Sequence, residues 1–108
     1  LNLDQTRITD NGMEHLGNLK NLEMLSLNGT SVSDAGLRHL SGMRKLRVLW
    51  LGRCRPNGIV EGTDITDLGL EQLKPLSKLE VLSVGGTEVT EAGEKDLGRA
   101  LPNLTIMH

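Results

Sequence analysis

Apolar and polar residues alternate in short segments that recur along this chain. Residues 22–27 read LEMLSL, and the same alternation returns at 46–51 and 79–84. A period of two is typical of a β-strand with one buried face. Between these segments the apolar residues stand three apart, as Leu37, Leu40 and Met43 do, which is the spacing of a helix with one buried face. The pattern therefore predicts strand–helix units in series.

The units also share their polar residues. The strand phrase LEMLSLNGT at 22–30 returns as LRVLWLGRC and LEVLSVGGT, and the helix phrase ITDNGM at 8–13 returns as VSDAGL, ITDLGL and VTEAGE. A fixed period of 20–50 residues indicates a stacked array in which each unit contacts only its neighbours. We treat residues 1–108 as one domain with units at 1–21, 22–45, 46–78 (with an insertion at 55–63), 79–103 and a partial unit at 104–108.

These phrases resemble the leucine-rich repeat family, whose units read LxxLxLxxT followed by xITDxGLxxLxxLxx. The resemblance covers the whole chain, although threonine stands where the family usually has Asn or Cys. The short TD.GL form is similar to the repeats of F-box substrate receptors and to bacterial repeats of this length. It implies an α/β fold, a right-handed solenoid with a parallel sheet on its concave face and helices on its convex face.

Polar residues at fixed places in the units predict local contacts. The threonines that follow the strands are expected to bond turn backbone, and a Ser or Thr before each helix is expected to cap it, with an acid next to it. A glycine in each first helical turn would let neighbouring helices approach closely. The turn threonines are Thr6, Thr30 and Thr87, and the cap residues are Thr9, Ser33, Thr66 and Thr90. The neighbouring acids are Asp10, Asp34, Asp67 and Glu91, and the glycines are Gly12, Gly36, Gly69 and Gly93.

Charge and cysteine content bear on two questions, whether the chain binds nucleic acid or membranes and in which compartment it works. The net charge of −2 gives no general attraction to nucleic acid or to an anionic membrane. Six basic and no acidic residues lie within 35–60, which fits either a solvated face or a patch for an acidic partner. The single cysteine, Cys54, excludes an intrachain disulfide and favours the cytoplasm or another reducing compartment. Cys54 fills the threonine position of its unit, unless Thr63 takes that position after the insertion.

The sequence shows no constellation for catalysis. It has three histidines, one cysteine, no glycine-rich phosphate loop and no metal-ligand spacing. His15 and His39 occupy the same place in adjacent helices, where they are expected to form a solvent-exposed polar column. We expect no catalytic residue, no metal ligand and no cofactor.

The outward strand positions are the most informative for binding. Most are small, and Trp50 is the exception, since it is the only aromatic residue of the chain. Tryptophan and arginine dominate binding hot spots, so an exposed Trp50 would anchor a partner, unless the insertion folds over it. Aligned outward columns read Asn2, Ser26, Trp50, Ser83 and His108, then Met24, Val48, Val81 and Ile106, then Asp4, Asn28, Gly52 and Gly85. The predicted partner-binding residues are Met24, Ser26, Val48, Trp50, Arg53, Arg55 and Ser83.

These observations favour a non-catalytic protein–protein interaction module that binds another protein through its concave strand face. The alternative is a regulatory or substrate-recognition fragment of a larger multidomain protein whose activity lies outside this chain. Binding of nucleic acid is disfavoured, because the basic residues divide between the two faces. The first and last units leave apolar layers uncovered, so self-association through the ends is expected.

Overall fold

The computed structural model describes residues 1–4, 6–54, 61–62 and 64–107. Its main sheet has four parallel strands in the order β1-β2-β5-β6, namely β1 (Met24–Ser26), β2 (Val48–Trp50), β5 (Val81–Ser83) and β6 (Thr105–Met107). A parallel bridge from Asn2 to Ser26 extends the sheet beyond β1. The predicted α/β class and the parallel pairing are confirmed.

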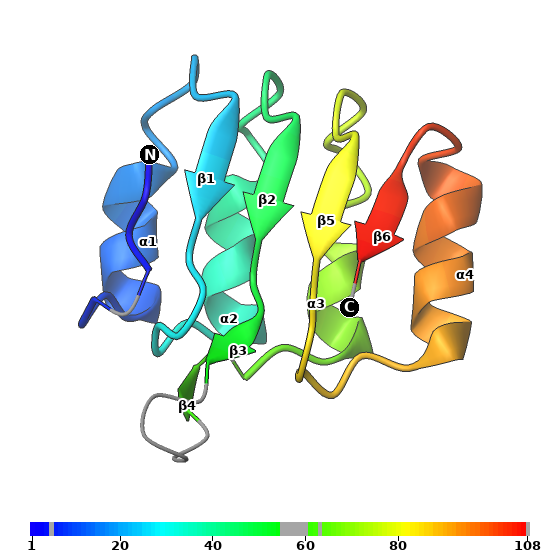
Figure 1. Ribbon diagram of the computed structural model, residues 1–108. Helices are drawn as coiled ribbons and strands as arrows, with labels where there is room; N and C mark the ends of the chain where they lie inside the picture. Colours follow the sequence, from blue (N-terminus) through cyan, green and yellow to red (C-terminus); the bar gives the residue numbers. More distant parts are fainter. Residues whose placement is uncertain (5, 55–60, 63, 108) are drawn as a thin grey trace.

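Helices cover one face of this sheet (Figure 1). They are α1 (Asp10–Leu16), α2 (Asp34–Leu37) with its 3₁₀ continuation η1 (Arg38–Leu40), α3 (Asp67–Glu71) and α4 (Glu91–Ala100). Each helix packs against the next one along the chain, as each strand pairs with the next. Strand–helix units therefore lie side by side in sequence order, as the hydrophobic pattern predicts.

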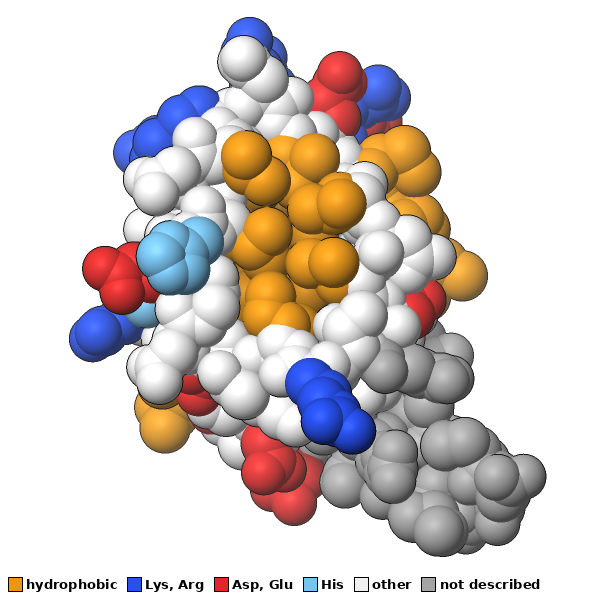
Figure 2. All heavy atoms as spheres, turned by 90° about the vertical axis from the view of Figure 1, so that its left-hand side faces the viewer, with side chains coloured by type: hydrophobic (Ala, Val, Ile, Leu, Met, Phe, Trp, Pro, Cys, Tyr) orange, Lys and Arg blue, Asp and Glu red, His pale blue; other side chains and the backbone are white. Residues whose placement is uncertain are grey.

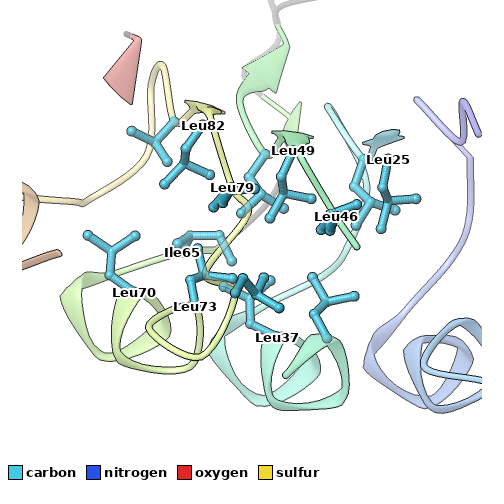
Figure 3. Close-up of a cluster of buried hydrophobic side chains, with 14 of the residues drawn as sticks. Leu25, Leu37, Leu46, Leu49, Ile65, Leu70, Leu73, Leu79 and Leu82 are labelled. Atoms are coloured by element: carbon cyan, nitrogen blue, oxygen red, sulfur yellow. The ribbon is translucent and has the colours of Figure 1, made fainter. Parts of the chain in front are cut away.

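An aliphatic core fills the space between the sheet and the helices (Figure 3). Leu25, Leu49 and Leu82 occupy one register row of the sheet and are fully buried. Leu37 and Leu73 come from the helical side and meet this row. No aromatic side chain is needed, because the layer between strand and helix is thin enough for leucine to fill it from both sides.

Carboxylates link each helix to the one that follows. Asp34 accepts two hydrogen bonds from Thr66 of the next unit, one from the backbone N–H at 2.8 Å and one from the hydroxyl. A Cβ added to Gly69 would overlap Asp34 Oδ1, the oxygen that accepts the Thr66 N–H, so glycine makes room for the carboxylate. We call this arrangement the aspartate bridge. Among the described residues it occurs three times, as Asp10–Ser33–Gly36, Asp34–Thr66–Gly69 and Asp67–Thr90–Gly93.

The aspartate bridge changes the interpretation of the capping residues. Thr9, Ser33, Thr66 and Thr90 do stand at the N-cap positions, as predicted. Only Thr66 and Thr90 accept a cap hydrogen bond, and Ser33 makes none. The hydroxyls of Ser33, Thr66 and Thr90 also donate to the carboxylate of the preceding unit, a charged acceptor that forms a stronger bond than a neutral one. The acids thus hold units together in addition to favouring their own helix starts.

The turns that leave the strands behave as predicted. The hydroxyls of Thr6, Thr30 and Thr87 each donate to the carbonyl three residues earlier, at 2.6–2.8 Å. Gly29 and Gly86 adopt positive φ angles of 70° and 75°, a conformation that glycine takes without a steric penalty. The hydroxyl is buried only at Thr30, since Thr87 is partly buried and Thr6 is exposed, so the three turns share the hydrogen bond and not the burial.

The insertion of the third unit starts as a two-stranded hairpin. Strands β3 (Arg53–Cys54) and β4 (Glu61–Gly62) pair antiparallel directly after β2. Cys54 therefore lies in a hairpin strand and not in the turn that Thr30 occupies. Thr63 and residues 55–60, including Arg55, lie outside the described residues.

In the part of the chain that the structure describes, no helix has the length and apolar character needed to cross a membrane.

Candidate functional site

None of the described helices covers the second face of the main sheet, and we call it the open sheet face (Figure 1). Alternate strand residues point to it, because successive side chains of a strand point to opposite faces. Register rows align Met24 with Val48 and Val81, and Ser26 with Trp50 and Ser83. The open sheet face consists of Asn2, Met24, Ser26, Val48, Trp50, Val81, Ser83, Thr105 and Met107.

The last strand departs from the predicted columns. Val81 pairs with Thr105 and Ser83 pairs with Met107, so Ile106 aligns with Leu82 of the core row. The predicted placement of Ile106 on the binding face is therefore wrong, and so is the pairing of His108 with Ser83. A shift of one residue reverses every side chain of a strand, and this register buries Ile106 partly while Thr105 and Met107 face outward.

A shallow pocket of about 390 Å³ lies at one edge of the open sheet face. Ser26 is its most buried member at 6% exposure, whereas Met24 is 49% exposed and Trp50 is partly buried. Because the serine is small, the larger side chains around it leave a hollow. The lining residues are Leu1, Asn2, Asp4, Met24, Ser26, Asn28 and Trp50.

Hydrogen bonds fix the polar side of this pocket. The Oδ1 atom of Asp4 accepts from the Ser26 hydroxyl and from the Asn28 backbone N–H, the latter at 2.8 Å. The side chain of Asn28 in turn accepts from the Gly52 N–H at 2.7 Å. Asp4 is the one charged side chain among the described residues that line the pocket. The carboxylate is therefore held in place beside an apolar surface.

The predicted binding residues separate into three groups. Met24, Ser26 and Trp50 line the pocket together, while Val48 and Ser83 are partly buried beside it on the same face. Arg53 pairs with Gly62 through its backbone, and Arg55 lies outside the described residues. Trp50 is neither fully exposed nor fully buried. The alternative prediction that the insertion folds over Trp50 falls on residues 55–60, which lie outside the described residues.

Asp4, Asn2 and Asn28 are pocket residues that the predicted set does not include. The aligned outward positions of the sequence already place Asp4 beside Asn28 and Gly52, and this alignment could have indicated that they belong to the same site. Their joint role depends on Ser26 being small enough for Asp4 to reach over it, which needs the three-dimensional arrangement.

Part of the basic segment is engaged in ion pairs outside the pocket. Arg47 lies between Glu23 and Glu80, which hold the same position in the neighbouring units. The hydrogen bond and charge of Arg47 lower the pKa of Glu80, and Glu80 raises the pKa of Arg47. Lys74 lowers the pKa of Asp96 in the same way on the helix side. At least Arg47 is therefore paired within the chain.

Among the described residues, no three or more His, Cys, Asp or Glu side chains are grouped so that they could hold a metal ion. Comparison of the chain with protein-family models finds no matching family, and comparison with curated proteins finds no match.

Proposed function

We propose that this chain is a non-catalytic protein-binding module that engages another protein through its open sheet face. We also propose that its units form a leucine-rich-repeat solenoid with the open sheet face on the concave side. The recurring LxxLxLxxT and TDxGL phrases support this architecture, together with the parallel strands and the helices on one side.

The observation that carries the binding proposal is the position of Trp50. The largest side chain of the chain lies in a pocket on the open sheet face and not in the core. Tryptophan is enriched among the residues that contribute most to binding energy in protein interfaces. A domain with an all-aliphatic core has no structural need for an indole at this place.

The pocket also indicates what kind of side chain it takes. Trp50 and Met24 offer apolar surface, while Asp4 offers a carboxylate that is already oriented. Lysine and arginine combine an apolar stem with a cationic head, and the head interacts favourably with both indole rings and carboxylates. We therefore propose a partner segment that inserts a basic side chain between Trp50 and Asp4.

Peptides selected from a displayed random library against the chain test this function. Trp50→Ala is expected to weaken binding of the selected peptides by about 2 kcal/mol, the scale of a hot spot. Isothermal titration calorimetry measures the loss. Leu68→Ala is the matched control, because Leu68 is 74% exposed on α3, on the helix side of the sheet, and its truncation should leave the affinity unchanged.

Peptides that bind Trp50→Ala as tightly as the unaltered chain would refute the proposed function. Selected peptides should also be enriched in Lys or Arg, and Asp4→Asn should weaken those peptides in particular. Peptides that depend on Trp50 but contain no basic residue would contradict only the proposed side-chain chemistry.

A further inference from the structure

The two oxygens of the Asp4 carboxylate differ in what they already bind. Oδ1 accepts two hydrogen bonds, one from the Ser26 hydroxyl and one from the Asn28 backbone N–H at 2.8 Å. Because an ionised carboxylate oxygen accepts about two hydrogen bonds, these two occupy Oδ1. Among the described residues no group donates a hydrogen bond to Oδ2. Asp4 therefore offers one oxygen to a side chain that enters the pocket.

Two asparagine side chains add acceptor oxygens to the same pocket. The Oδ1 atom of Asn2 accepts from the Asp4 N–H at 2.9 Å, and the Oδ1 atom of Asn28 accepts from the Gly52 N–H at 2.7 Å. A backbone N–H can only donate, so these bonds fix which atom of each amide is the oxygen. Each amide oxygen accepts a second hydrogen bond at its other lone pair. Asn2, Asp4 and Asn28 all line the pocket, so it has three separately placed acceptors.

Apolar surface lies next to these oxygens. Met24 is 49% exposed, and both Met24 and Trp50 line the pocket. Figure 2 looks onto the side of the molecule where residues 1–4 and α1 lie, and apolar side chains gather at its centre. A basic side chain can lay its methylene stem on Met24 and Trp50 while its charged head reaches the oxygens.

Lysine and arginine differ in how their charged heads donate. The lysine ammonium carries three N–H groups that point in different directions, whereas the arginine guanidinium holds its donors in one plane. Arginine gains most from a carboxylate when two parallel N–H groups meet both oxygens. The Ser26 hydroxyl blocks that arrangement, because it helps to occupy Asp4 Oδ1. Three single oxygens suit an ammonium, which can donate to each of them.

Stacking on Trp50 is the opposing effect, because a guanidinium stacks on an indole ring better than an ammonium does. At a partly exposed ring this contact changes the affinity by about two- to fivefold. A hydrogen bond to a charged group changes it by about tenfold or more. The arrangement of the acceptor oxygens therefore decides which cation binds more tightly.

We propose that the pocket selects lysine over arginine, and that Ser26 determines this specificity by occupying Asp4 Oδ1. The inference rests on the proposed function, in which a basic side chain of a partner protein enters between Trp50 and Asp4. The ammonium of that lysine donates to Asp4 Oδ2 and to the amide oxygens of Asn2 and Asn28. Each of the three N–H groups then has its own acceptor.

One library-selected peptide, synthesised in three forms, tests the selectivity. Its basic position carries lysine, arginine or trimethyllysine, and isothermal titration calorimetry gives the affinity of each form. The arginine form should bind about tenfold more weakly than the lysine form. Trimethyllysine keeps the positive charge but has no N–H group, so it should bind at least about tenfold more weakly. Equal binding of the lysine and trimethyllysine forms would show recognition by charge and Trp50 alone and would overturn the proposal.

Ser26→Ala frees a lone pair of Asp4 Oδ1 and should move the preference towards arginine. The ratio of lysine to arginine affinity is expected to fall about tenfold, because the guanidinium can then meet both oxygens. Ser83→Ala is the matched control, since Ser83 lies in the same row of the sheet but does not line the pocket, and the ratio should stay unchanged. Circular dichroism checks that both variants keep their fold. A Ser26→Ala protein that binds both forms more weakly at an unchanged ratio would show a structural role only and would contradict the assignment.

The failure of this inference can be told apart from the failure of the proposed function. Affinity lost in Trp50→Ala supports the function, whichever cation is preferred. Peptides that depend on Trp50 but bind equally well with lysine and with arginine overturn the selectivity alone. Selected peptides that contain no basic residue overturn it as well.

Discussion

Replacing Leu49 by alanine is expected to lower the free energy of unfolding by about 4 kcal/mol, near the upper end for a buried leucine. Leu49 is fully buried in β2, and it aligns with Leu25 on one side and Leu82 on the other. The cavity would open between paired strands whose hydrogen bonds resist collapse. Because domains of this size are stable by only about 5–15 kcal/mol, this single change removes a large share.

Urea unfolding followed by circular dichroism measures the loss. Leu68→Ala deletes the same atoms from a side chain that is 74% exposed, and its cost should stay within about 0.5 kcal/mol. Equal losses for the two variants would show that the row formed by Leu25, Leu49 and Leu82 is not the centre of the core.

Replacing Gly69 by alanine is expected to cost about 3 kcal/mol, although alanine is the better helix former by about 1 kcal/mol. The new methyl group would overlap Asp34 Oδ1 and lie 2.9 Å from a methyl carbon of Leu37. Asp34 cannot move aside without losing its bonds to Thr66, each worth about 1.5 kcal/mol or more for a charged acceptor. The change would therefore weaken the junction between two units.

Gly98→Ala is the matched control, because Gly98 also lies in a helix and a Cβ there meets nothing within 4 Å. It should raise the stability by up to about 1 kcal/mol, through the helix propensity of alanine alone. Both variants are compared by the midpoint of thermal unfolding. A Gly69→Ala protein as stable as Gly98→Ala would contradict the aspartate bridge as a close contact.

Much of the fold follows from the sequence for simple physical reasons. The strand and helix periods differ, so the row of Leu25, Leu49 and Leu82 and the helical leucines can be told apart by spacing alone. The threonine turns follow as well, because a hydroxyl after a strand has few backbone partners other than the carbonyl three residues earlier.

Other features depend on contacts between units. The sequence places Asp34 and Thr66 at helix starts but does not say that the acid of one unit serves the hydroxyl of the next. The register of β6 could not be fixed because helix α4 is longer than the others, which alters the count of residues before the strand. The pocket depends on residues 1–4 lying beside β1 and β2, since Asp4 reaches Ser26 only after folding.

The emission of Trp50 during partner binding is the most direct test of the central claim, because Trp50 is the only tryptophan and the signal has no other source. A selected peptide that occupies the pocket should shift the emission to shorter wavelength and protect it from acrylamide quenching, in proportion to the bound fraction measured by calorimetry. Saturable binding that leaves both the wavelength and the quenching of Trp50 unchanged would contradict the account.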